Sequence, residues 1–556
     1  MDYMSAKEAA KRWGISVRRV QNLCKDGRIP KAQRISNSWI IPSGSRRPKD
    51  LRKKQSVKKK KIEAVILPER KPPEIVDYEK LLQQDFRGMR YLNLNGRPFV
   101  EVVLQTLKEC PKKVRRKYPL ALLQMAFALT GIHCYRQLFQ NTLQEIKDIL
   151  KEYPCDPEEK DQLLGEYEVI LSFADYPDFK KMIPHFQKAK ILCRQTIRCI
   201  ALTESLTMGG FPAIPAFERL GRDEEEQLSA LAKILECLEA IADGLGQGLE
   251  PLWRADIAYY EGRMEEAKGL AFESLYISRS RGQDCVSMGA LELLSHIAIH
   301  TDDVELWNQS LDELKTLAEN ESVCDVGKKI MYVIIRSELY NALDIPERVE
   351  TWIKKGQICF TWMPDNMYVT AQYIHIAYLF HKGQYIQELA AVKTALPFAI
   401  ENVPQVAYYM RLFGVAALCE LDRKEEAREM FLGTMSMFSD QHQILNCGEF
   451  YWIMRELMEE YFDSHTWLKG QVGQLKKNYG YGLTKLNADI CNRQLPRTIT
   501  NREYEVAVEA ARGKTNKEIA RYLVISEHTV RTHLRSIFKK MAVEKRNELK
   551  KKLLDS

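Results

Sequence analysis

The chain has 556 residues, of which 45% are hydrophobic and 28% are charged, and its formal net charge at pH 7 is +8. This composition is that of ordinary globular protein, and it excludes a long disordered chain, a collagen and a disulfide-stabilised miniature scaffold. The length predicts three or more folded domains with ample buried core.

The charge is distributed unevenly. Residues 1–70 contain 20 Lys and Arg against 6 Asp and Glu, residues 497–556 contain 15 against 8, and the residues between them contain 48 against 61. An acidic middle between two basic ends fits a protein whose ends contact a polyanion while its body does not.

Cysteine usage and hydropathy predict a cytoplasmic protein. The 13 cysteines form no C-x-x-C pair, which favours free thiols in a reducing compartment over disulfides or zinc. No stretch reaches the ~18 uninterrupted apolar residues of a membrane span, and the first residues lack the apolar run of a signal peptide. We therefore expect no membrane partner.

Residues 1–45 carry the pattern of a small winged helix-turn-helix. Ser5 caps a first short helix, a tight turn follows at 14–16, and a second helix ends at Gly27. The stretch AQRISNSWIIP then alternates as a two-stranded wing does, with Trp39 and Ile41 facing inward.

This segment resembles the MerR/excisionase-type winged helix. The resemblance rests on Ser5-Ala6-Lys7-Glu8-Ala9-Ala10, Trp13-Gly14-Ile15-Ser16, Gly27-Arg28-Ile29-Pro30 and Ser38-Trp39. Lys31 and Ser36 stand where that family often has glycine, which leaves the geometry of the wing open. A docking module with the same fold and only protein contacts is the alternative. As nucleic-acid contacts of this segment we expect Ser16, Arg18, Arg19, Gln21, Asn22 and Arg34.

Residues 46–75 form a basic linker. Its first part, RRPKDLRKKQSVKKKK, holds ten basic residues against Asp50, and such a block is typical of an unstructured arm. Two interpretations stay open: the arm lies along DNA phosphates, or it is a solvated connection.

Residues 76–490 show nearly continuous helical periodicity. The turns EGRMEEA, TDDVELW, LDIPERV, KGQYIQE and LDRKEEA begin at positions 261, 301, 343, 382 and 421, at spacings of 40, 42, 39 and 39. Each turn separates a helix rich in Ala and aromatic residues from a second amphipathic helix, which predicts an α-solenoid of stacked hairpins. Similar turns from Thr130 and Phe173 extend the array to about residue 100, and residues 203–250 interrupt it as a longer connection or an irregular helix pair.

The repeat pattern resembles the tetratricopeptide-like region of MalT-type and related LuxR-family regulators. Stacked hairpins imply a curved surface lined by one helix from each repeat, suited to a small ligand, a peptide or a protein. Five aromatic residues either line that surface or pack between repeats, and we assign none of them to a pocket: Tyr259, Tyr260, Trp307, Tyr373 and Tyr378.

Residues 496–556 contain clear helix boundaries. Thr500-x-x-Glu503 and Thr515-x-x-Glu518 are capping boxes, Gly513 is a left-handed stop, and Ser526 caps a third helix. The third helix has one apolar face, with Val530, Leu534, Ile537, Phe538 and Met541, and a polar face that either contacts DNA or is only solvated.

Residues 499–549 resemble the LuxR-type (GerE-like) helix-turn-helix, through Arg502-Glu503, Asn516-Lys517-Glu518-Ile519-Ala520, Ile525-Ser526-Glu527, Thr529-Val530-Arg531 and Arg546. The resemblance implies that the helix from Ser526 is the recognition helix, that Lys517 lies near the DNA backbone, and that a last helix from about Val543 helps to form a dimer. The expected DNA contacts are Thr515, Asn516, Lys517, Ser526, His528, Thr529, Arg531, Thr532, Arg535 and Lys539.

The sequence thus predicts a mainly α protein, with a tetratricopeptide-like solenoid between a small winged helix-turn-helix and a four-helix LuxR-type domain. We expect a sequence-specific transcription regulator that binds double-stranded DNA as a homodimer and senses an effector, with RNA polymerase as a candidate further partner. The alternative is a helical-repeat scaffold whose terminal modules contact proteins. Motifs for catalysis, such as H-E-x-x-H or G-x-S-x-G, are absent from the sequence, so we expect no enzyme, cofactor or metal site.

Overall fold

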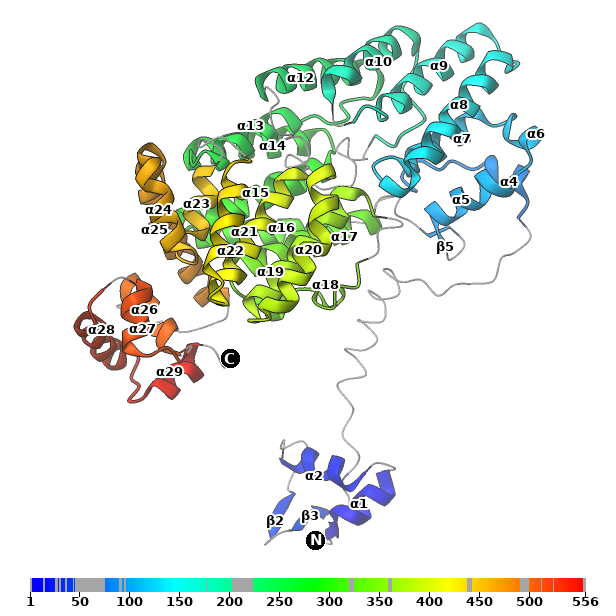
Figure 1. Ribbon diagram of the computed structural model, residues 1–556. Helices are drawn as coiled ribbons and strands as arrows, with labels where there is room; N and C mark the ends of the chain where they lie inside the picture. The colour runs from blue at the N-terminus through cyan, green and yellow to red at the C-terminus, as the bar shows by residue number, and fades with distance from the viewer. Residues whose placement is uncertain are drawn as a thin grey trace. The chain divides into compact units, whose positions relative to one another are not determined.

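The computed structural model describes residues 3–553, apart from 14–15, 26–28, 30–31, 36–37, 44, 46–75, 90–92, 95–96, 177, 203–223, 320–324, 359–362, 438–442, 491–499, 512 and 524 (Figure 1). The chain divides into two compact units, Met1–Lys71 and Pro72–Ser556. The basic linker predicted at 46–75 lies outside the described residues.

The first unit is a helix-turn-helix with a small sheet. Its elements are β1 (Tyr3–Ser5), α1 (Ala6–Trp13), α2 (Val17–Lys25), β2 (Gln33–Ile35) and β3 (Ser38–Pro42). The predicted cap is confirmed, because the Glu8 amide donates to Ser5 Oγ at 3.2 Å and the Ser5 amide donates to Glu8 at 2.7 Å.

The sheet of this unit has three strands rather than the two predicted for the wing. The order is β1-β3-β2, both pairs are antiparallel, and Met4 lies opposite Ile41. A strand of three residues is too short to show alternation, so the pattern missed β1. Ile41 is fully buried among Ala9, Ala10 and Val20, and Trp39 packs against the same core.

The second unit begins with helices and one small hairpin. In chain order they are α4 (Tyr78–Leu82), β4 (Asn93–Leu94), β5 (Arg97–Pro98), α5 (Phe99–Glu109), α6 (Lys112–Arg115), α7 (Pro119–Leu129), η1 (His133–Tyr135), α8 (Arg136–Glu152), α9 (Pro157–Ser172), α10 (Phe179–Leu192) and α12 (Glu224–Ile241). The turns predicted from Thr130 and Phe173 are confirmed, because α7 and α9 end there.

Of residues 203–250, which the sequence predicted as a longer connection or an irregular helix pair, 203–223 lie outside the described residues and 224–250 differ from the prediction. Residues 224–241 form one regular helix, α12, which packs against α10. A glycine-rich turn follows, and Gly244, Gly246 and Gly248 all have positive φ. These glycines end the helical pattern early, which made a whole segment look irregular in the sequence.

The next helices form hairpins at each of the five predicted turns. Their bounds are α13 (Leu249–Tyr260), α14 (Met264–Ser280), α15 (Asp284–Thr301), α16 (Val304–Glu319), α17 (Asp325–Ala342), η2 (Pro346–Arg348), α18 (Thr351–Lys354), α19 (Asp365–His381), α20 (Tyr385–Asn402), α21 (Pro404–Glu420) and α22 (Lys424–Met435). The third hairpin departs from the prediction, since a one-turn helix, α18, stands where a full second helix was expected. Gly356, with φ of 63°, follows α18 and ends it.

These turns share one backbone feature. Each turn places one residue in the left-handed region, either a glycine or an aspartate, with φ between 55° and 76°. Glycine adopts this conformation without strain, and the short side chain of aspartate tolerates it better than most. The five residues are Gly262, Asp302, Asp344, Gly383 and Asp422.

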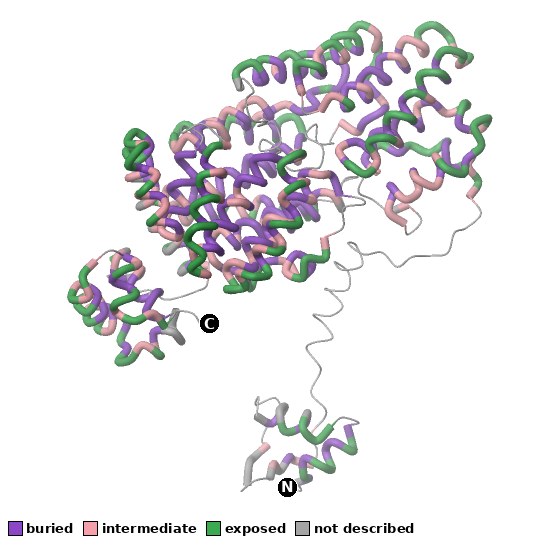
Figure 2. The backbone as a smooth tube through the Cα atoms, in the orientation of Figure 1, coloured by how far each residue is buried: buried purple, intermediate pink, exposed green. Residues whose placement is uncertain are grey.

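Successive helices pack as neighbours, and the first helix of each hairpin is the more buried (Figure 2). In α21, for example, thirteen of the 17 residues are buried, whereas α22 buries four of 12. The first helices therefore form the interior layer of the repeats, and the second helices have one face in solvent.

The repeats end in α23 (Ile444–Phe450), α24 (Arg455–Ser464) and the long helix α25 (Thr466–Ile490). Helix α25 packs against α23 and returns to α15, far back in the chain. Lys485 Nζ lies 2.9 Å from Asp302, and Asn487 donates to the carbonyl of Leu343 at 2.6 Å. A Cβ added at Gly482 would lie 1.7 Å from the carbonyl oxygen of Ile299, so glycine is required where the two helices cross.

The last four helices are α26 (Asn501–Ala511), α27 (Asn516–Leu523), α28 (Glu527–Lys540) and α29 (Arg546–Leu553). Both capping boxes are confirmed, since Thr500 bonds Glu503 and Thr515 bonds Glu518. Gly513 has φ of 92°, as the predicted stop requires. The last helix begins at Arg546 rather than near Val543, which is buried in the preceding turn. Among the described residues, no helix is long and apolar enough to cross a membrane.

Candidate nucleic-acid interface

Helix α28 has two chemically opposite faces. Its N-cap is Ser526, whose hydroxyl accepts a hydrogen bond from the Thr529 amide at 3.0 Å. Val530 and Ile537 are fully buried, and Leu534 is nearly so, in a core built from all four helices of the segment. One side of α28 is thereby fixed, and the other is turned outward.

The predicted contact residues lie on the outward side of α28 and around the start of α27. Asn516 and Thr529 are half-buried. Those that are exposed are Thr515, Lys517, Ser526, His528, Arg531, Thr532, Arg535 and Lys539.

Several of these side chains have internal partners. The hydroxyls of Thr515 and Ser526 serve as helix caps, and Asn516 accepts a hydrogen bond from Arg546. Arg531 lies 3.6 Å from Glu527, one turn earlier on the same helix. Among the described residues, Lys517, Arg535 and Lys539 have no carboxylate partner. Among the predicted contact residues, these three cations are therefore available to a polyanion.

Glu503 holds α28 on the rest of the segment. Its carboxylate accepts hydrogen bonds from Thr500 at 2.8 Å, from Lys540 at 2.6 Å and from Ser536. Burial alone would raise the pKa of Glu503, but the hydrogen bonds from Lys540, Ser536 and Thr500 lower it to about 2. The sequence marked Glu503 only as a cap; its bonds to α28 depend on the fold.

In the N-terminal unit, the exposed residues are Ser16, directly before α2, and Arg18 and Gln21 within α2. Arg19 and Asn22 lie in α2 and Arg34 lies in β2, but their side chains fall outside the described residues.

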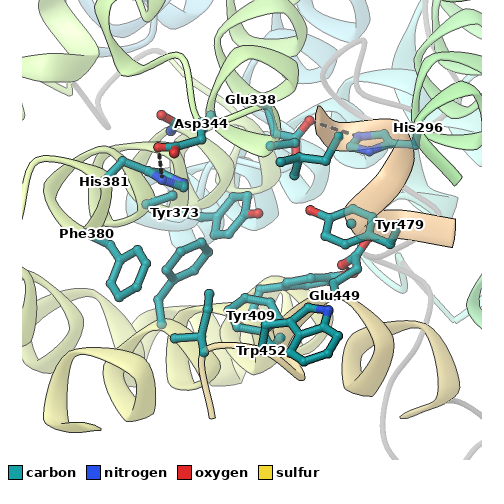
Figure 3. A pocket seen from close by; sticks show the side chains of 18 of the residues that line it. His296, Glu338, Asp344, Tyr373, Phe380, His381, Tyr409, Glu449, Trp452 and Tyr479 are labelled. Carbon is teal, nitrogen blue, oxygen red and sulfur yellow. Dashed lines mark hydrogen bonds and ion pairs between the residues drawn. The ribbon is translucent and has the colours of Figure 1, made fainter. Parts of the chain in front are cut away.

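The second unit also holds a cavity of about 910 Å³. The first helix of each hairpin contributes to its wall, as the solenoid pattern implies, and α23 and α25 add further residues. Figure 3 shows Glu338, Tyr373, Tyr409, Glu449 and Tyr479 around the same space. Among the aromatic residues that the sequence singled out, Tyr259, Tyr260 and Tyr373 line this cavity, whereas Trp307 packs fully buried between helices and Tyr378 is not part of the wall.

Three titratable side chains of the cavity lie close together. Glu292, His296 and Glu338 each offer one ligand atom, and these atoms lie within 4.8 Å of one another. His296 Nε2 lies 2.9 Å from Glu338. Burial would lower the pKa of His296, but the charge of Glu338 raises it to about 9; burial and the same charge raise the pKa of Glu292 well above its usual range. The sequence analysis had predicted no such cluster, because Glu338 of α17 meets Glu292 and His296 of α15 only after the helices pack.

The geometry thus defines a protein with helical repeats, with one helix-turn-helix domain before them and one after them in the chain. Residues 497–552 match the luxR family of bacterial regulatory proteins, and residues 3–45 match a helix-turn-helix domain family. The C-terminal segment is therefore a luxR-type helix-turn-helix, as its motifs indicated.

Curated relatives match short parts of the chain. The CsgBAC operon transcriptional regulatory protein of Escherichia coli (strain K12) is 38% identical over 81 residues, which are 15% of this chain and 38% of that protein. The monoamine regulon transcriptional regulator of Klebsiella aerogenes is 49% identical over 55 residues, which are 10% of this chain and 24% of that protein. The chain thus spans at most 38% of the length of either relative.

Among solved structures, a Rap protein complexed with competence and sporulation factor is similar with a TM-score of 0.33 and 13% sequence identity. The similarity covers 80% of this chain and 99% of that chain. A similarity of this strength carries no information about function.

Proposed function

We propose that this chain is a transcription regulator in which α28 reads operator DNA and the helical repeats sense an effector. The proposal rests chiefly on α28, whose apolar face is buried while its opposite face presents exposed polar and basic side chains. The major groove of DNA admits one helix, and such side chains reach base edges and phosphates there. The matched family and the names of both relatives support the same function.

The distribution of partners supports a division between cations that stabilise the domain and cations that contact DNA. Lys540 and Lys514 bond Glu503 and Glu509, and Arg546 bonds the carbonyl of Lys514, so these side chains hold the domain together. Arg535 and Lys539 on α28 are exposed and unpaired among the described residues. We assign Arg535 to a base edge and Lys539, with Lys517 on α27, to phosphates. The remaining expected contacts lie on α27 and α28 or just before their first residues: Thr515, Asn516, Ser526, His528, Thr529, Arg531 and Thr532.

The N-terminal helix-turn-helix supplies a second nucleic-acid contact in this proposal, through exposed residues such as Arg18 and Gln21 on α2. A homodimer on paired half-sites follows from the usual geometry of helix-turn-helix proteins, and RNA polymerase is a further partner of such a regulator.

Effector sensing is assigned to the cavity of the repeats. Its wall includes Tyr479 and Leu483 of α25, and α25 is the last helix of the repeats before the luxR-type segment in the chain. An occupant of the cavity touches α25 directly. A ligand that makes better contacts with one position of α25 than with another would shift the equilibrium between the two positions. This shift would transmit the signal.

A matched pair of arginine variants tests DNA reading. Arg535→Ala removes an outward cation from α28, whereas Arg194→Ala removes an exposed arginine from the repeats. Loss of a base contact costs about 1–3 kcal/mol, so we expect Arg535→Ala to weaken operator binding roughly 5- to 150-fold and to relax specificity. Arg194→Ala is expected to bind as the parent chain does.

The measurement is a gel-shift titration of the full chain with a duplex selected by that chain from a random pool. Equal affinities of the parent chain and Arg535→Ala for this duplex would contradict the proposed contact between α28 and operator DNA. An equal loss in both variants would show a nonspecific charge effect instead.

A further inference from the structure

The cavity of the repeats concentrates buried carboxylates. Its described wall within residues 252–487 includes six acidic residues and one lysine, Lys382, whose ammonium group bonds Glu347 at 3.0 Å. Glu292 and Glu338 are 8% and 9% exposed, and neither has a lysine or arginine partner among the described residues. The charged partner of Glu338 is His296, at 2.9 Å, and burial raises the pKa of Glu292 well above its usual range. Buried carboxyl groups with so few cations near them are costly to ionise, and a cation that enters the cavity lowers that cost.

Glu449 forms a second acidic position, which neighbouring side chains hold in place. The hydroxyls of Tyr259 and Tyr409 each donate to its carboxylate at 3.4 Å, and His300 Nε2 lies 3.2 Å away. Burial raises the pKa of both tyrosines, so their hydroxyls keep the protons that they donate. Figure 3 shows Glu449 and Glu338 on different parts of the wall, with Tyr373 and Tyr479 near them.

Aromatic rings supply the rest of the wall. The Tyr373 and Tyr409 ring centroids are 5.8 Å apart, and Phe413 lies 5.9 Å from Tyr373. Trp452 and Tyr479 also face the cavity. The face of such a ring attracts a cation, and the rings together accept an apolar body.

The same features favour an organic cation over a metal ion. A volume of about 910 Å³ is in the range of cavities that hold organic ligands, and a metal ion would leave most of the space and the aromatic wall unused. A metal ligand must be deprotonated, whereas His296 is paired with Glu338 and has its pKa raised to about 9.

We propose that the cavity beneath α25 binds a ligand with a primary ammonium group on an apolar or aromatic body. The ammonium group lies among Glu338, Glu292 and Glu449, and the body packs on the tyrosines and Trp452. This inference rests on the proposed function only for the role of the ligand as an effector; binding itself is independent of DNA. The chemistry is shared by small arylalkylamines and by the free N-terminus of a peptide.

Calorimetry on the full chain tests the proposal with two pairs of probes. The first pair is 2-phenylethylamine and 2-phenylethanol; the second is the peptide Phe-Gly-Gly with a free and with an acetylated N-terminus. We expect one ammonium probe to bind at least tenfold more tightly than its neutral analogue. This difference in the first pair would identify a small amine as the ligand, and the same difference in the second pair would identify a peptide.

Three glutamine variants locate the site. Glu338→Gln and Glu449→Gln are expected to weaken the ammonium probe about tenfold or more. Glu388→Gln is the matched control, because Glu388 is fully buried and has a pKa raised to about 9 by burial but is not part of the cavity wall. It should leave binding unchanged.

Three results would overturn the proposal: no binding of either ammonium probe at millimolar concentration, equal binding of the neutral analogues, or stoichiometric binding of zinc alone that Glu338→Gln abolishes. The DNA affinity of the same preparation is measured separately, so that a failure to bind amines and a failure to bind DNA are distinguished.

Discussion

Glu503 is the residue on which the position of α28 depends most directly. Its carboxylate caps α26 through Thr500 and bonds Ser536 and Lys540 on α28, and it is 5% exposed. Removing the charge of Glu503 leaves the half-buried ammonium group of Lys540 without a carboxylate partner. The hydrogen bonds that lower the pKa of Glu503 to about 2 therefore also stabilise the folded segment.

Glu503→Gln should raise the rate of amide hydrogen exchange in α26 and α28 of the full chain near pH 7. The lowered pKa corresponds to a local stabilisation on the order of 2–3 kcal/mol by linkage. Because the pKa in the folded state lies below the unfolded value, this stabilisation is present above about pH 4.5 and is lost as the pH falls towards 2. The difference between the parent chain and the variant should shrink over that interval. A difference that stays constant from pH 6 to pH 3 would contradict the assignment.

At the scale of elements, the position of α25 is constrained by its close crossing with α15. Gly482→Ala would place a Cβ 1.7 Å from the carbonyl oxygen of Ile299, so the helices must separate. Such overpacking costs about 1–3 kcal/mol or more. We expect faster hydrogen exchange in α25 and α15 of the full chain.

Gly473→Ala is the matched control on the same helix. A Cβ at Gly473 meets nothing within 4 Å, so alanine should be neutral or should stabilise α25 by up to about 1 kcal/mol through helix propensity. If both variants exchanged alike, the close crossing of α25 and α15 would be wrong.

The sequence predicted local features of the fold well. The five repeat turns were recognised because each needs a residue that tolerates positive φ, and Gly262 and Asp302 are of that kind. The helix boundaries near Thr515 and Ser526 followed from capping chemistry. These signals lie within a few residues of one another, and pattern analysis can read them.

Long-range features escaped the sequence. The crossing at Gly482 joins residues more than 180 positions apart in the chain, and no period marks it. The carboxylates of the cavity come from separate hairpins, so their convergence appears only after the hairpins stack. At the nucleic-acid interface, the sequence identified the outward face of α28 but not which cations the domain uses internally, such as Lys540.

At the scale of the whole molecule, the charge distribution supports the proposed function. The basic residues 497–556 include the luxR-type segment, and the basic residues 1–70 include the other helix-turn-helix, while the repeats between them are acidic. A polyanion is thus attracted to the two domains and repelled by the body. A helical-repeat scaffold that contacts only proteins has no need of this arrangement.

The salt dependence of DNA binding by the full chain tests the central claim most directly. The equilibrium constant for a duplex selected by the chain is measured by fluorescence anisotropy at several salt concentrations, together with that for a scrambled duplex. The account predicts a preference for the selected duplex, a steep linear fall of log K with log salt, and a slope reduced by about one unit in Lys517→Ala. Equal binding of both duplexes with a slope near zero would contradict it.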